Sequence, residues 1–160
     1  FRSQLNEDQE RLTTLSIPNN RIKNIRIKTY EPPYDEYDLP RKYEYLIELG
    51  KKLPPLEESS RQEKNLIKGC QSRVWLDVSR KEGKLFFKAD SDALITKGII
   101  SLLVHVFSGH TPAQILDSDM SFIEKIGLKE HLSPTRANGL LSMMQQIQMY
   151  ALVANTENPA

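Results

Sequence analysis

The pattern of hydrophobic and polar positions has a period of two residues near the middle of the chain. Between residues 74 and 79 every second side chain is apolar, which predicts a β-strand. Residues 81–84 contain a glycine and lead into a second alternating stretch, residues 85–89, so we expect an antiparallel hairpin. An isolated hairpin is only marginally stable. We therefore expect a third strand beside it, formed by residues 65–68 or by residues 25–29.

Helical spacing dominates on either side of this hairpin. Residues 38–50 combine an Asp cap, an early Pro, apolar positions at helical spacing and a final Gly. Residues 95–106 carry one apolar stripe, which we expect Asp90-Ser91-Asp92 to cap. Thr111-Pro112 and Ser133-Pro134 each begin a further helix. We therefore predict the α+β class, with a small antiparallel sheet of about three strands packed by segregated helices.

The prolines at residues 32 and 33 suggest a domain boundary, because they exclude regular helix there. We divide the chain into an N-terminal extension of uncertain structure, residues 1–33, a compact domain, residues 34–154, and a C-terminal tail, residues 155–160. Basic and isoleucine residues alternate loosely over residues 21–28, which fits a short basic strand or a solvated extension. We favour the solvated extension.

Composition narrows the function classes. The chain has 160 residues with 22 Lys+Arg against 21 Asp+Glu, and a net charge of +1 is not typical of a nucleic-acid-binding domain. A single cysteine excludes a disulfide within the chain and a multi-cysteine metal site. The apolar runs are too short to predict a membrane span. We expect no bound metal, no nucleic acid, no membrane partner and a cytoplasmic location, in a bacterium or as a processed plastid form.

Cys70 is the only residue with strongly nucleophilic chemistry, and it lies in a loop between two predicted elements. Its side chain either fills a small space in the core or acts as a nucleophile. As a hydrolase or transferase nucleophile it would need a base, and the chain's histidines are His105, His110 and His131. No spacing ties any of them to Cys70. Arg136 lies in the first turn of the last helix, where the helix dipole disfavours a cation, so an anionic group or solvent must hold it.

Five ordered segments carry a resemblance to the SufE family of sulfur acceptors, which includes CsdE-type proteins. The segments are Tyr45–Gly50, Gly69–Trp75, Ala89–Ala93, Ser108–Pro112 and His131–Leu140. The sequence resembles this family from residue 34 to residue 153. It departs from the family in Tyr34–Pro40, where an apolar segment with a Trp usually begins the first helix, and residues 1–30 match nothing in it.

The resemblance implies a SufE/IscU-like fold and a sulfur relay. A cysteine desulfurase of the SufS or CsdA type, which carries the pyridoxal phosphate (PLP), would pass persulfide sulfur to Cys70. The chain would stimulate that desulfurase, bind no cofactor itself, and deliver the sulfur to an iron–sulfur scaffold of the SufBCD type. The family positions that match partner-binding or loop-stabilising residues are Gln71, Ser72, Asp92, His131 and Arg136. The alternatives are a cysteine-dependent hydrolase or transferase with a histidine base, and a scaffold or interaction protein whose cysteine is incidental.

Overall fold

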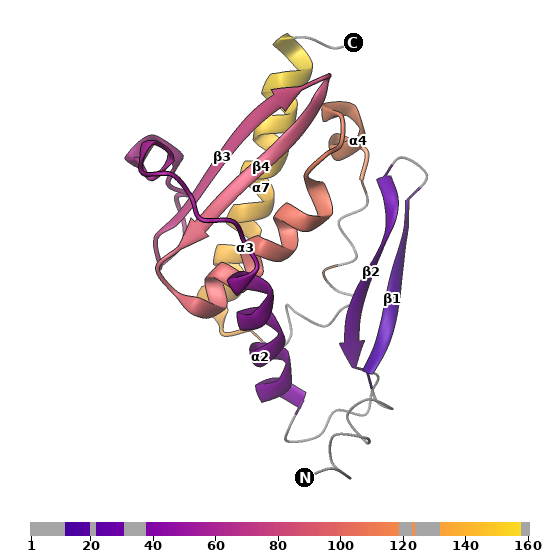
Figure 1. Cartoon of the computed structure of the whole chain (residues 1–160), viewed down its shortest axis with the longest axis vertical. Helices are drawn as coiled ribbons and strands as arrows, with labels where there is room; N and C mark the ends of the chain where they lie inside the picture. Colours follow the sequence, from indigo (N-terminus) through magenta and orange to yellow (C-terminus); the bar gives the residue numbers. More distant parts are fainter. Residues whose placement is uncertain (1–11, 20–21, 31–37, 119–122, 124–131, 158–160) are drawn as a thin grey trace.

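The structure is a computed structural model that describes residues 12–19, 22–30, 38–118, 123 and 132–157 (Figure 1). Its strands are β1 (Leu12–Asn19), β2 (Ile22–Tyr30), β3 (Val74–Lys81) and β4 (Lys84–Ser91). Its helices are α2 (Asp38–Lys51), α3 (Leu94–Phe107), α4 (Pro112–Leu116) and α7 (Pro134–Glu157), with 3₁₀ turns η1 (Glu58–Ser60) and η2 (Glu63–Asn65). No helix within these described ranges is long and apolar enough to cross a membrane.

Strands β3 and β4 form the predicted hairpin, pairing from Val74 opposite Ser91 to Lys81 opposite Lys84. Its two-residue turn places both Glu82 (φ 53°) and Gly83 (φ 79°) in the left-handed region. Such turns match the right-handed twist of the flanking strands, which explains the tight connection. One face of the hairpin is buried and the other is partly exposed, as the alternating pattern predicts.

Neither segment predicted as a third strand joins this sheet, because within the described residues β3 and β4 form a sheet of two strands. Residues 65–68 contribute only an isolated bridge between Leu66 and Trp75. The turn η2 precedes this segment and Gly69, with φ of 92°, follows it, so too few extended residues remain for a strand. Helices α3 and α7 bury the apolar face of the hairpin instead, and the α+β class is confirmed.

Residues 25–29 lie in β2, which pairs with β1 in a separate sheet. The solvated extension predicted for residues 21–28 is therefore wrong, since residues 22–30 form a strand. The register pairs Leu15 with Ile27 and Ile17 with Ile25, whereas Ser16 pairs with Arg26. Apolar positions thus match apolar positions across the hairpin, and this pairing favours the sheet. The expected domain boundary lies in residues 31–37, outside the described residues.

Helices α2 and α3 cross at two glycines. A Cβ on Gly98 would overlap the Leu46 carbonyl group, and a Cβ on Gly50 would lie 2.9 Å from the backbone nitrogen of Gly98. Only glycine permits this approach, because any larger residue would push the helices apart. The crossing brings Ile47 of α2 close to the N-terminal turns of α3, where both helices contribute to the pocket described below.

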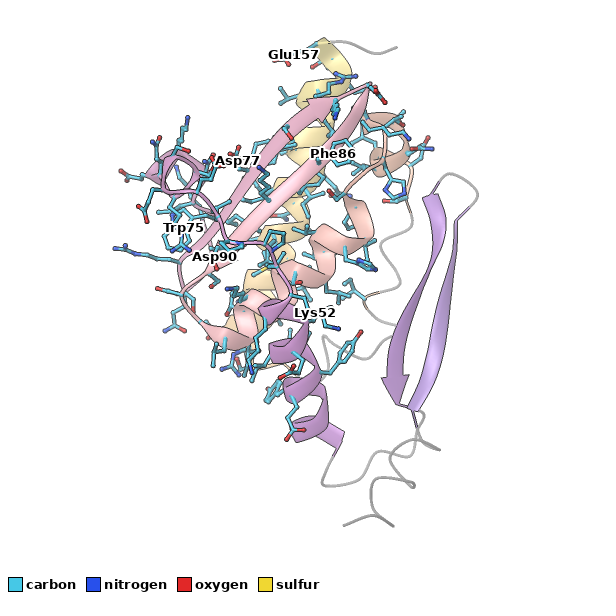
Figure 2. All side chains as sticks on the ribbon, in the orientation of Figure 1. Lys52, Trp75, Asp77, Phe86, Asp90 and Glu157 are labelled. Atoms are coloured by element: carbon cyan, nitrogen blue, oxygen red, sulfur yellow. The ribbon has the colours of Figure 1, made fainter. Side chains whose placement is uncertain are left out.

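The predicted cap of α3 is also wrong. The N-cap residue is Ala93, which offers no side-chain hydrogen bond. Asp90 is buried and instead forms ion pairs with Arg61 and with Lys97, the latter at 3.3 Å between Nζ and Oδ1. The Arg61 guanidinium also lies 5.7 Å from the ring centroid of Trp75, the cross-strand neighbour of Asp90 (Figure 2). Tertiary pairing therefore takes Asp90 away from the capping role.

Candidate functional site

The loop that carries Cys70 is closed at its base and rests on helix α7. The Ile67 amide donates to the Val74 carbonyl at 2.8 Å, which joins the two ends of the loop. Gly69 has a φ of 92° and lies against Ser142 of α7, whose hydroxyl a Cβ at this position would overlap. A glycine is therefore required both by the backbone conformation and by the close approach. This geometry turns Cys70 toward α7.

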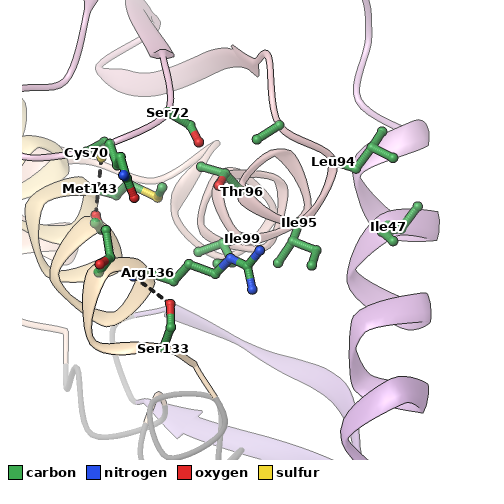
Figure 3. Close-up of a pocket in the computed structure, with 14 residues that line it drawn as sticks. Ile47, Cys70, Ser72, Leu94, Ile95, Thr96, Ile99, Ser133, Arg136 and Met143 are labelled. Carbon is green, nitrogen blue, oxygen red and sulfur yellow. Dashed lines mark hydrogen bonds between the residues drawn. The ribbon is translucent and has the colours of Figure 1, made fainter.

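The Cys70 thiol is half-buried and donates a hydrogen bond to the Gly139 carbonyl, with 3.6 Å between Sγ and oxygen (Figure 3). Burial raises the pKa of the Cys70 thiol above its ordinary value. The hydrogen bond acts in the same direction, because only the protonated sulfur can donate to a carbonyl. In this conformation the surroundings of Cys70 favour the protonated thiol over the reactive thiolate.

Cys70 lines a pocket of about 610 Å³ between its loop, the start of α3 and the start of α7. Ile47, Ile99 and Met143 form part of its apolar wall. Hydroxyl groups also line it, from the residues Ser72, Thr96, Ser133 and Thr135. None of the described lining residues is acidic. Across the described ranges, no three His, Cys, Asp or Glu side chains gather as metal ligands would.

Arg136 brings a positive charge to this pocket. Its side chain extends from the first turn of α7 toward α3 (Figure 3). The guanidinium carbon lies 5.6 Å from the ring centroid of Tyr43, in cation–π geometry. Among the described residues no carboxylate forms an ion pair with Arg136. Its charge is therefore not neutralised by a neighbour in this part of the chain.

Asp92 lies at the other end of the cysteine loop and does not line the pocket. Its Oδ1 accepts a hydrogen bond from the Arg73 amide at 3.1 Å, and its own amide donates to the Arg73 carbonyl at 3.3 Å. The Ser91 hydroxyl donates to that same carbonyl at 2.8 Å. Three hydrogen bonds thus fasten the residue at which the loop joins β3.

The structure separates the remaining predicted residues. Gln71 and Ser72 line the pocket, and their side chains form no hydrogen bond with a described residue. His105 is exposed on α3, while His110 is buried with Nδ1 3.3 Å from the Phe107 carbonyl oxygen. Neither of these two histidines lines the pocket, so neither supports the alternative of a histidine-activated cysteine. His131 lies outside the described residues.

Sequence reasoning did not find two groups that the pocket brings to Cys70. Gly139 supplies the carbonyl that accepts from the thiol, and Thr96 supplies a buried hydroxyl. The only signal for Thr96 was a polar residue interrupting the apolar run of α3. Gly139 gave no signal, because a carbonyl acceptor depends on helix packing and not on residue type.

Comparisons with known proteins agree with this architecture. The family model named SufE, described as an Fe-S metabolism associated domain, matches residues 36–151. This chain belongs to the SufE family. An uncharacterized SufE-like protein of Synechocystis is 36% identical to this SufE-family chain over 115 residues, which cover 72% of each protein. The family predicted from the sequence is thus confirmed.

A solved structure supports the fold independently. The solution structure of a hypothetical protein from Thermus thermophilus is similar with a TM-score of 0.62. The similarity covers 73% of this chain and 86% of that protein, at 24% sequence identity. At this identity the likeness establishes the fold alone.

Proposed function

We propose that this SufE-family chain accepts persulfide sulfur on Cys70 from a PLP-dependent cysteine desulfurase, stimulates that desulfurase, and passes the sulfur on for iron–sulfur cluster assembly. The observation that carries the proposal is a half-buried free thiol in a glycine-hinged loop, held by one hydrogen bond over a pocket. The PLP stays with the desulfurase, of the SufS or CsdA type. A SufBCD-type scaffold receives the sulfur in the cytoplasm.

The transfer is a thiol exchange without net redox change. The Cys70 thiolate attacks the outer sulfur of the desulfurase persulfide, the sulfur–sulfur bond of the donor breaks, and the desulfurase cysteine leaves as a thiolate. A new sulfur–sulfur bond on Cys70 replaces the old one. The rate depends on the fraction of thiolate, so a protonated Cys70 docked on α7 reacts slowly.

Movement of the loop couples exposure of the thiol to its reactivity. Leaving the pocket breaks the bond to the Gly139 carbonyl and restores solvation, which lowers the Cys70 pKa toward the value of about 8.5 for a free cysteine. The docked form therefore protects the sulfur, and a partner that draws out the loop also activates it. Asp92 restrains this motion through its hydrogen bonds to Arg73.

Arg136 favours the loaded state once the loop returns. A persulfide anion on Cys70 would face a pocket with a guanidinium and no described acidic residue, and this environment stabilises negative charge. The hydroxyls of the pocket supply further donors. Arg136 therefore holds the anionic sulfur, with Gln71, Ser72 and His131 as further loop or partner contacts.

The test is a desulfurase assay with the intact chain. Incubation with a cysteine desulfurase, PLP and cysteine should add one sulfur atom to Cys70 by intact mass and should increase desulfurase turnover. Cys70→Ser is the matched control: serine can still donate to Gly139 but cannot hold a persulfide. Absence of sulfur on Cys70 together with unchanged turnover would show that the relay is wrong.

A further inference from the structure

Two helix N-termini converge on the Cys70 pocket. The first turn of α3 enters it through Leu94, Ile95 and Thr96, and the first turn of α7 through Thr135 and Arg136. Ala93 gives α3 no side-chain cap, and the amides of its first turn have no acceptor among the described residues. Free amides and the helix dipole make such an end favourable for an anion.

Thr96 provides an independent observation at the same pocket. The residue is only 8% exposed and lines the pocket, and its hydroxyl has no hydrogen-bond partner within the described residues. Figure 3 shows the Thr96 side chain on the wall of the pocket that faces the Cys70 loop. A buried hydroxyl without a partner is unfavourable, because it has lost its hydrogen bonds to water. A ligand that accepts a hydrogen bond would remove this cost.

The charge and the volume of the pocket narrow the class of ligand further. Arg136 gives the pocket a positive charge that no described carboxylate balances. The volume of about 610 Å³ is far more than one added sulfur atom needs. It falls in the range of about 300–1,000 Å³ that is usual for small-molecule sites. A pocket of this charge and volume suits a small organic anion whose reactive group could reach the Cys70 thiol.

We propose that this pocket binds a low-molecular-weight persulfide that carries a carboxylate, and that Cys70 takes sulfur from it without a desulfurase. The carboxylate accepts hydrogen bonds from Arg136, Thr96 and the first turn of α3, while the persulfide lies at Cys70. The inference rests on the proposed function only in treating Cys70 as a sulfur acceptor.

The reaction balances without an oxidant or a reductant. Cys70 first loses its proton to solvent, and its thiolate then attacks the outer sulfur of the small persulfide, whose sulfur–sulfur bond breaks as a new one forms on Cys70. The carrier molecule leaves as a thiolate and takes up a proton from solvent. Because this exchange is reversible, the same site also lets a loaded Cys70 return sulfur to a small carboxylate-bearing thiol.

Glutathione persulfide is the probe, and its dimethyl ester is the matched control without carboxylates. Sulfur uptake by Cys70 is followed by intact mass over a series of probe concentrations. We expect uptake from the acid to saturate and, below saturation, to exceed uptake from the ester by about tenfold or more, since bonds to charged groups are the strong ones. Equal, unsaturable rates for the two probes would overturn the inference.

Thr96→Val keeps the shape of the side chain and removes its hydroxyl. Uptake from the acid should fall by about threefold to tenfold, uptake from the ester should not change, and the Tm should not fall, because the hydroxyl has no partner to lose. Arg136→Gln should lower uptake from the acid more strongly, with partial rescue by Arg136→Lys. A wild-type rate in both Thr96→Val and Arg136→Gln would contradict the site.

Two further arms separate the possible outcomes. S-methylglutathione should inhibit uptake competitively, and inorganic phosphate at equal concentration should inhibit it much less; equal inhibition would refute a site for carboxylate-bearing thiols. The desulfurase assay is run on the same preparation. If the desulfurase loads Cys70 but the two glutathione probes react equally, this inference alone fails. If only glutathione persulfide loads Cys70, the desulfurase relay fails.

Discussion

The two helices that follow the β3–β4 hairpin begin in opposite ways. Helix α4 is only five residues long, yet Thr111 and Gln114 form a complete capping box at its start. The Thr111 hydroxyl accepts from the Gln114 amide at 3.2 Å, and the Gln114 side chain accepts from the Thr111 amide at 2.9 Å. Helix α3 has fourteen residues and begins at Ala93 without any side-chain cap.

This difference distinguishes a helix start that stabilises the fold from one at which we propose that a ligand binds. In the segment that leads into α4, the Leu85 amide donates to the His110 carbonyl at 2.8 Å, and the Phe87 amide donates to the Ser108 hydroxyl at 3.0 Å. At the start of α3, Thr96 and the first-turn amides have no described partner. Local rules of folding are satisfied at α4 and broken at the start of α3, and in natural proteins such departures are expected at sites that bind a ligand or a partner.

The largest effect is expected at the glycine that directs the cysteine loop onto α7. Gly69→Ala should destabilise the fold by about 2 kcal/mol or more, because it combines a left-handed backbone with a clash against Ser142. Gly83→Ala is the matched control, since it has a similar φ of 79° but no atom within 4 Å of the new Cβ. Urea unfolding measures both, and an equal loss in the two variants would show that the contact with α7 is unimportant.

The next effect concerns the fastening of the loop at Arg73. Asp92→Ala removes the acceptor of the Arg73 amide, so it should lower stability by only about 0.5–1.5 kcal/mol. It should nevertheless speed alkylation of Cys70 by iodoacetamide several-fold, because the loop leaves α7 more often. Glu48→Ala, which removes an exposed ion pair with Lys51, is the control. Unchanged alkylation in Asp92→Ala would show that Asp92 does not restrain the loop.

The comparison of the two helix starts is tested directly by removing the N-cap side chain of α4 and adding one to α3. Thr111→Ala should destabilise the protein by about 1 kcal/mol, whereas Ala93→Ser should stabilise it by about 0.5–1 kcal/mol by supplying the missing cap. Ala93 has φ −116° and ψ 132°, which suit an N-cap serine. Thermal unfolding measures both changes. A loss of stability in Ala93→Ser would mean that the first-turn amides of α3 already have hydrogen-bond acceptors.

The smallest effect is the dependence of stability on pH through the thiol. Burial raises the pKa of Cys70 in the folded state, so the folded protein holds this proton more tightly than the unfolded chain. The contribution of the thiol to the free energy of unfolding is complete below the ordinary thiol pKa. It is lost as the pH rises through the raised pKa of the folded state. Urea unfolding between pH 7 and the alkaline limit should therefore show a decline that is smaller in Cys70→Ser. The same decline in both proteins would contradict the raised pKa.

Much of the fold follows from local patterns. The period of two residues located β3 and β4, and the stripe of apolar residues located α3 almost to the residue. Thr111-Pro112 gave the start of α4 correctly, since a capping box involves only neighbours in sequence. The caps expected from Asp90 and Asp92 failed because these carboxylates have other partners: Asp90 pairs with Arg61 and Lys97, and Asp92 accepts from the Arg73 amide.

By itself, the sequence determined the class of fold, the family, and Cys70 as the candidate nucleophile, because periodicity and motifs are set by residues near one another in the chain. Only the tertiary structure decided that, within the described residues, the β3–β4 sheet has two strands and that the Cys70 thiol donates to the Gly139 carbonyl. It also decided that Thr96 and Arg136 share a pocket with that thiol. The physical reason is packing: Cys70, Thr96 and Arg136 come from three separate segments, and they meet because α3 and α7 bury the same face of one hairpin.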